Sequence, residues 1–177
     1  MMKRTCIGLM IGFFMFLASC AQDSTSGTNN DVKDITGYVM SVNEQIILVT
    51  EKTEGSQPNA AVYTITEETD IVSTEGEKLS KSDLSVGTQV EVWHTGVVQE
   101  SFPTQATATK ILVHTDEDAQ RVAKGIHAAV QTLDPNLTWW VKSVEEVDSE
   151  YHVTFSELMG DTEPVVIKVD QNFQVIE

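Results

Sequence analysis

The chain has 177 residues, of which 27 are acidic and 11 are Lys or Arg, so its formal net charge is −16 at pH 7. A surface of this sign repels phosphate backbones, which argues against nucleic-acid binding. The apolar fraction of 41% is sufficient for the core of one or two small domains.

The first twenty residues are typical of an export signal. Lys3 and Arg4 give a cationic start, and the apolar run from Cys6 to Leu17 is shorter than the roughly 20 residues that a membrane-spanning helix needs. Leu17-Ala18-Ser19-Cys20 then resembles the lipobox of bacterial lipoproteins. The resemblance implies a signal peptide over residues 1–19, cleavage after Ser19, and lipid attachment at Cys20 with palmitate-type acyl chains. The protein would then be anchored on the outer face of the cell membrane. The alternative is an ordinary cleaved signal peptide followed by a chance cysteine.

Processing at this site would change both the charge and the thiol content of the chain. Loss of Lys3 and Arg4 leaves 9 basic residues against 27 acidic ones, a formal charge of −18. Such a body is repelled by anionic headgroups, so we expect the lipid to supply the membrane contact and the protein to be monomeric. Cys6 leaves with the leader and Cys20 is acylated, which leaves no disulfide, cysteine nucleophile or Cys-ligated zinc.

Residues 20–34 are rich in Ser, Thr, Gly, Asn and Asp and predict a flexible tether. From residue 35 the pattern changes to short runs of β-branched and aromatic residues. Gly37 suits a bulge or a sharp bend, and Asn43-Glu44 suits a tight turn. The pattern predicts strands over 35–42, 45–51, 61–68, 88–94 and 106–114, with a short helical turn over 79–84.

Three strands, a helical connection and two more strands is the order of an OB-type barrel. Residues 35–114 are therefore predicted to form an OB-like five-stranded β-barrel. The turn and strand residues also resemble the YobA-like lipoproteins of bacilli, a family of unknown function with an OB-like domain. The resemblance is carried by Gly37-Tyr38-Val39, Asp83-Leu84-x-x-Gly87 with Val90-x-Val92, Gly96-Val97-Val98-x-Glu100-Ser101-Phe102-Pro103, and Gln105-Ala106.

Residues 115–177 predict a small α+β unit, one helix followed by an antiparallel meander. Thr115 is the expected N-cap, apolar residues recur at helical spacing up to Leu133, and Asp134-Pro135 ends the helix. The later runs LTWWVKSVEEV, EYHVTFSELM, EPVVIKVD and FQVIE predict three or four strands. The order of elements weakly resembles PepSY-like and cystatin-like units. The whole chain is thus expected to be mainly β, in the α+β class.

Large aromatic residues are the main candidates for a recognition surface: Trp93, Phe102 and Trp139. Trp139 and Trp140 must point to opposite sides of their strand, so one of them leaves the core under the helix. The alternative is that these rings fill the seam between the two units. We therefore predict a non-enzymatic binding or accessory module, without a cofactor, whose partner is an envelope protein, peptide or glycan.

No catalytic or metal-ligating residue is assigned from the sequence. His94 and His114 close two predicted strands and could converge on a metal or flank Glu100, but a third ligand is missing. His127 and His152 are expected at the surface. An envelope-polymer hydrolase that uses carboxylates such as Glu91 or Glu100 is one alternative function, and a divalent-cation-binding protein is another.

Overall fold

The computed structural model describes residues 31–176. The expected signal peptide of residues 1–19, the lipid attachment site at Cys20 and the tether up to residue 30 lie outside the described residues. Within the described range no helix is long and apolar enough to cross a membrane. The elements in chain order are β1 (Val32–Val42), β2 (Ile46–Glu51), β3 (Ala60–Thr64), β4 (Asp70–Ser73), η1 (Lys81–Asp83), β5 (Gln89–Gln99), β6 (Thr104–Val113), α1 (Glu117–Val130), β7 (Trp139–Val147), β8 (Glu150–Glu157), β9 (Val165–Val169) and β10 (Val175–Ile176).

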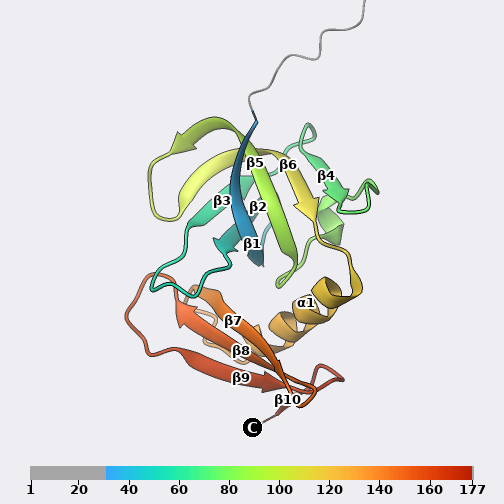
Figure 1. The fold of residues 1–177 in the computed structure, drawn as a ribbon. Helices are drawn as coiled ribbons and strands as arrows, with labels where there is room; N and C mark the ends of the chain where they lie inside the picture. Colours follow the sequence, from blue (N-terminus) through green and yellow to red (C-terminus); the bar gives the residue numbers. More distant parts are fainter. Residues whose placement is uncertain (1–30, 177) are drawn as a thin grey trace, which may run out of the picture.

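The first half of the chain forms the predicted OB-like barrel (Figure 1). β1, β2 and β3 make an antiparallel meander, β5 pairs with the other edge of β1, and β6 pairs with β5. A parallel pairing between β3 and β6 closes the five strands into a barrel. β4 adds a sixth strand, which pairs in parallel with residues 110–113 of β6, beyond the residues that pair with β3.

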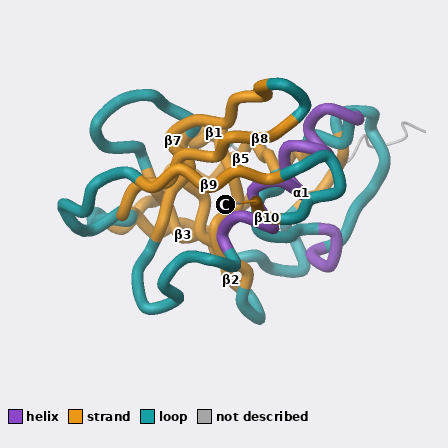
Figure 2. Tube along the Cα trace, turned by 90° about the horizontal axis from the view of Figure 1, so that it is seen from below, coloured by secondary structure: helices purple, strands orange, loops and turns teal. Residues whose placement is uncertain are grey.

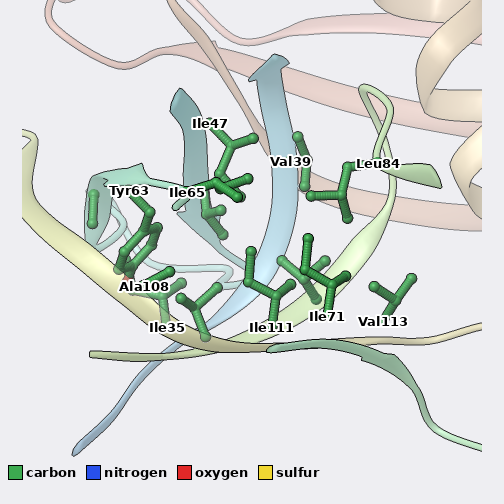
Figure 3. Packing of buried hydrophobic residues seen from close by; sticks show 14 residues of the cluster. Ile35, Val39, Ile47, Tyr63, Ile65, Ile71, Leu84, Ala108, Ile111 and Val113 are labelled. Atoms are coloured by element: carbon green, nitrogen blue, oxygen red, sulfur yellow. The ribbon is translucent and has the colours of Figure 1, made fainter. Parts of the chain in front are cut away.

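The interior of the barrel is filled by the inward-facing side chains of each strand. On β5, Val90 and Val92 are fully buried, while Glu91 and Trp93, which alternate with them, face outward. This is the alternation that a strand requires. Figure 3 shows the isoleucine, valine and tyrosine side chains of all the barrel strands converging on this core. Burial on this scale explains how the barrel can form without a disulfide.

Several element bounds differ from those expected. β1 begins at Val32, three residues before the predicted boundary at Ile35, because Val32 and Lys33 pair with the end of β5. β5 continues through Gly96 to Gln99, and the connection to β6 is correspondingly short. β4 was not predicted, because it has only four residues and follows the acidic segment Glu67-Glu68. Its pairing with β6 holds it in place.

The C-terminal unit is one helix on an antiparallel meander, as predicted, and of the three or four expected strands the structure has four, in the order β10-β9-β8-β7. The helix begins differently from the expectation: Asp116, not Thr115, is the N-cap, and its side chain accepts a hydrogen bond from Ala119 N. A carboxylate suits this position because its negative charge is also attracted to the positive end of the helix dipole. The helix ends at Val130, and a turn follows before Asp134-Pro135.

The two units share one hydrophobic cluster, which we call the seam core. From the outer face of the barrel it includes Tyr38, Met40, Leu48 and Ala60, which are 2–8% exposed. From the C-terminal unit it includes side chains of α1 and of β7–β9. Seen from below, the strands of the C-terminal sheet overlie the barrel strands (Figure 2), so the second unit covers the outer face of β1–β3.

Gly87 marks a close approach between the barrel and the helix. It lies in the turn before β5 with φ of +93°, a conformation that glycine adopts without strain. A Cβ added there would overlap the carbonyl oxygen of Ala123 in α1 and lie 3.1 Å from Ile126 Cβ. The absence of a side chain at Gly87 therefore lets the helix pack directly on the barrel.

Candidate functional site

The two adjacent tryptophans of β7 face opposite sides of the C-terminal sheet. Trp139 is paired with Glu157 and Trp140 with Ser156, and Trp139 shares its face with the buried Val141–Phe155 pair. Trp140 points away from that face, as the sequence required of one of the two. Both rings are nevertheless buried, at 9% and 1% exposure, and both belong to the seam core. Trp139 is therefore a packing residue and does not form an exposed recognition surface.

Trp140 lies at one side of a hollow of about 480 Å³ between the two units, which we call the seam hollow. Its walls come from the β2–β3 loop, the β5–β6 loop, and β8 with the loop that follows it. The lining residues are Ser56, Gln57, Pro58, Phe102, Trp140, Glu157, Leu158, Met159, Gly160 and Asp161. Phe102 is 39% exposed and Met159 is 63% exposed, so the hollow has an apolar rim that faces water.

The loop that presents Phe102 is held by its own polar groups. Ser101 Oγ donates to the carbonyl of Pro103 at 2.6 Å, and Thr104 Oγ1 donates to the carbonyl of Ala60 at 3.2 Å. The Phe102-Pro103 peptide bond is cis. These contacts fix the loop to β3, so Phe102 projects from an ordered support, which lowers the entropy cost of binding a ligand.

The seam hollow also contains two carboxylate side chains, Glu157 and Asp161. The Glu157 carboxylate lies over Gly160, where an added Cβ would overlap it. With Ser56 and Gln57 opposite, the hollow offers hydrogen-bond acceptors, an amide and a hydroxyl beside the apolar rim. This mixture suits an uncharged or cationic ligand that has an apolar part.

A second hollow of about 430 Å³ lies between the barrel and the segment that joins α1 to β7. It is lined by Trp139 and mainly apolar residues, namely Met40, Ser41, Leu48, Val86, Val130, Gln131, Leu133, Asp134, Pro135, Leu137 and Thr138. Trp139 Nε1 donates to the carbonyl of Asp134 at 3.0 Å, which satisfies the polar atom of the ring. None of the exposed large hydrophobic side chains of the described residues lines this hollow, so it is the weaker candidate.

Trp93 lies apart from both hollows, on the outer wall of the barrel. The ammonium groups of Lys33 and Lys110 lie 5.5 and 5.1 Å from the centre of its ring. Lys33 also pairs with Glu91 at 2.5 Å, and His114 contacts the same carboxylate at 3.2 Å. The hydrogen bond from Lys33 is the main reason why the pKa of Glu91 lies below its usual range. The three predicted recognition residues Trp93, Phe102 and Trp139 are thus not brought together.

His94 and His114 do not converge, contrary to the possibility that the sequence left open. β5 and β6 are antiparallel, so His94 pairs with Ala108 while His114 lies beside Gln89 at the other end of the ladder. His114 faces the outer wall and His94 is buried at 5% exposure. Neither histidine contacts Glu100, which is exposed in the β5–β6 connection.

His94 and Tyr63, both buried, form a polar cluster with the more exposed Asp34 at one end of the barrel. Tyr63 Oη donates to Asp34 Oδ2 at 2.6 Å, and His94 Nε2 lies 3.5 Å from the same oxygen. His94 Nδ1 accepts from Gly96 N at 2.8 Å, which leaves the ring proton of the neutral imidazole on Nε2. Burial, followed by the bond to Asp34, raises the pKa of Tyr63. The cluster ties the beginning of β1 to β3 and β5.

Among residues 31–176, no group of three or more His, Cys, Asp or Glu side chains is arranged to hold a metal ion. Of the carboxylates suggested for a hydrolase, Glu91 is engaged by Lys33 and His114, and Glu91 and Glu100 line neither hollow. The seam hollow instead contains Glu157 and Asp161, which the sequence did not single out. Their common site depends on the packing of loops from two units, for which no local pattern exists.

Comparison with known families gives one match, to a model described as a protein of unknown function (DUF3221), over residues 36–114. Neither the curated proteins nor the solved structures give a match. The matched residues coincide with β1 to β6 apart from the first four residues of β1. A DUF3221 domain of unknown function therefore covers residues 36–114, and it has the form of an OB-like barrel.

Proposed function

We propose that this protein is a lipid-anchored, extracytoplasmic binding or accessory module, and that the seam hollow receives its ligand. The anchor is supported by the lipobox-like Leu17-Ala18-Ser19-Cys20 and by the likeness of the barrel residues to the YobA-like lipoproteins of bacilli. The partner would be an envelope protein, peptide or glycan.

The main support for the proposed binding site is that the C-terminal unit covers part of the outer face of the barrel and leaves one barrel loop accessible. OB-type barrels commonly bind ligands across the face of their second and third strands and with the loops at its ends. Here Leu48 and Ala60 of that face are buried in the seam core. The β5–β6 loop with Phe102 remains accessible, and it opens onto the seam hollow. A shared fold does not imply a shared ligand, so other OB-type barrels suggest only where a ligand would bind. The class of ligand is inferred from the side chains that line the seam hollow.

The side chains of the hollow favour a peptide segment without negative charge. Met159 is an adaptable apolar contact and Phe102 a rigid one, a combination that suits protein and peptide ligands. Glu157 and Asp161 disfavour an anionic ligand at the same place.

The experiment is capture from envelope membranes with the acylated full-length protein, comparing wild type with Phe102→Ala. Val166→Ser is the matched control, because Val166 is 53% exposed on β9 and lies outside the hollow. Capture of the same partner should fall at least about fivefold for Phe102→Ala, which corresponds to 1 kcal/mol, and should persist for the control. Equal capture by both variants would reject the hollow as the binding site.

A second candidate function is hydrolysis of an envelope polymer, which the shared location of Glu157 and Asp161 favours. The double variant Glu157→Gln with Asp161→Asn separates the two functions. It should abolish polymer cleavage by a hydrolase, whereas a binding module cleaves nothing before or after the change.

A further inference from the structure

β7 is an edge strand of the C-terminal sheet. It comes last in the order β10-β9-β8-β7, and Figure 1 shows it as the strand of that sheet nearest the barrel. The turn at Asp148-Ser149 has φ of +50° and +71°, as in a two-residue hairpin turn, so Val147 and Glu150 are a hydrogen-bonded pair. Alternation from that pair leaves the N–H and C=O groups of Val144 and Glu146 pointing away from β8.

The outward backbone groups of β7 lie beside open space. Within residues 31–176, no backbone–backbone hydrogen bond joins Val144 or Glu146 to any strand other than β8. A hollow of about 270 Å³ borders the edge, between residues 142–145 of β7 and residues 52–54. Residues 145–147 beyond it are exposed. Such a row of unpaired N–H and C=O groups is a template for pairing with another extended chain.

We infer that the outer edge of β7 receives an extended, basic peptide segment of the partner as an added strand. This inference rests on the proposed function and gives its mode of binding. Trp140 of the same strand lines the seam hollow, and the β2–β3 loop borders both hollows, so the added strand runs toward Phe102. Main-chain hydrogen bonds give the affinity of an added strand, because another extended backbone matches the spacing of the free groups.

The charges along β7 favour a basic segment. Two lysines and two glutamates line the hollow beside the edge, so the hollow itself has no net charge (Lys52, Glu54, Lys142 and Glu145). Toward the hairpin turn the strand is acidic, because Glu145, Glu146 and Asp148 are all exposed. Adjacent strand residues point to opposite faces, so two consecutive Lys or Arg residues of the segment would lie across from Glu145 and Glu146.

A second copy of this chain is the poorer occupant of the edge. Self-pairing that centres on Glu145 or Glu146 sets like charges directly opposite each other, which destabilises an antiparallel pair. Self-pairing that centres on Val144 meets the irregularity at Lys142, where the register of the β7–β8 ladder shifts. The formal charge of −16 on each copy adds to the repulsion.

Hydrogen exchange of single amides in the acylated full-length protein tests the edge directly. The amides of Val144 and Glu146 should exchange at least about 100-fold faster than the amide of Glu145, which bonds to β8. The peptide Thr-Val-Lys-Lys-Val-Thr at about 1 mM should slow exchange at both outward positions at least about threefold. Its fully N-methylated form, which has no backbone donor, should slow neither. Equal exchange at all three positions without peptide, or no slowing by the peptide, would overturn the inference.

Two variants of Glu146 separate the backbone from the charge. Glu146→Pro removes the outward N–H at a position where an edge strand tolerates proline, and it should weaken peptide binding at least about tenfold. Glu146→Gln keeps the N–H and should weaken binding by no more than about fivefold. Equal losses would assign binding to the charge alone and overturn strand addition. Should Glu146→Pro fail to fold, the N-methylated peptide tests the same bonds on the wild-type protein.

Phe102→Ala distinguishes this inference from the proposed ligand site. Slowed exchange at Glu146, together with membrane capture that does not depend on Phe102, would reject the seam hollow and keep the added strand. Capture that depends on Phe102, without any slowing at Glu146, would overturn the added strand alone. Wild-type dimers that dissociate on Glu146→Pro would assign the edge to a second copy and also overturn the inference.

Discussion

Replacing Gly87 with alanine tests how the barrel and helix α1 hold each other. The new methyl group would have to be accommodated at a φ of +93° and against the carbonyl of Ala123. The backbone conformation alone costs about 1–2 kcal/mol for a residue other than glycine. Overlap with the helix backbone adds about 1–3 kcal/mol, because either α1 or the turn must shift. We expect the free energy of unfolding to fall by about 2–5 kcal/mol.

Gly76→Ala is the matched control for this variant. Gly76 has a φ of +87°, but an added Cβ would meet nothing within 4 Å, so only the backbone cost of about 1–2 kcal/mol applies. Urea denaturation measures both losses, and at an m-value of about 2 kcal/mol/M a loss of 3 kcal/mol lowers the midpoint by about 1.5 M. If Gly87→Ala loses no more stability than Gly76→Ala, the helix does not rest on this turn, and the packing described for the seam is wrong.

Three further predictions concern single contacts. Folding raises the pKa of Tyr63, so its contribution to stability is present below pH 10, the ordinary value of a tyrosine, and is lost as the pH rises above it. In urea denaturation at different pH values, Tyr63→Phe should therefore lose less stability than wild type between pH 9 and 11. An unchanged dependence of the free energy of unfolding on pH would contradict this role. Lys33→Met removes the main cause of the low Glu91 pKa, so an NMR titration should show that pKa rising, and a constant value would contradict the pairing. Trp140→Ala removes a ring that is 1% exposed and should cost about 3–5 kcal/mol in urea unfolding, whereas a loss below 1 kcal/mol would show that the ring is not packed in the seam core.

The barrel was largely predictable because its strands carry their own signal. Alternation of Val90 and Val92 with Glu91 and Trp93 indicates a half-buried strand without any knowledge of the partner strands. Gly37 was predicted to mark a bulge or bend, and the structure shows a different requirement, since an added Cβ would overlap the carbonyl oxygen of Thr50 on β2. The ladder irregularities lie on either side of it, between Lys33 and Thr36 and between Val39 and Ser41.

The seam was much less predictable, because tertiary packing decides it. The sequence required one ring of the Trp139-Trp140 pair to leave the core under the helix, but it could not show that barrel loops cover that ring. Phe102 was predicted as a recognition residue, and it does lie at the rim of a hollow. Met159, Glu157 and Asp161 complete that hollow from a different unit, and nothing local in the sequence relates them to Phe102.

Thiol protection on β2 tests most directly whether the second unit covers the outer face of β1–β3. Ile46 and Leu48 point to the same side of β2, yet Ile46 is 38% exposed and Leu48 is 8% exposed beneath the C-terminal unit. In a background with Cys6→Ser and Cys20→Ser, Ile46→Cys should react readily with a thiol reagent, and Leu48→Cys should react at least about tenfold more slowly, since its reaction requires opening of the seam. Equal reaction rates at the two positions under native conditions would contradict the account.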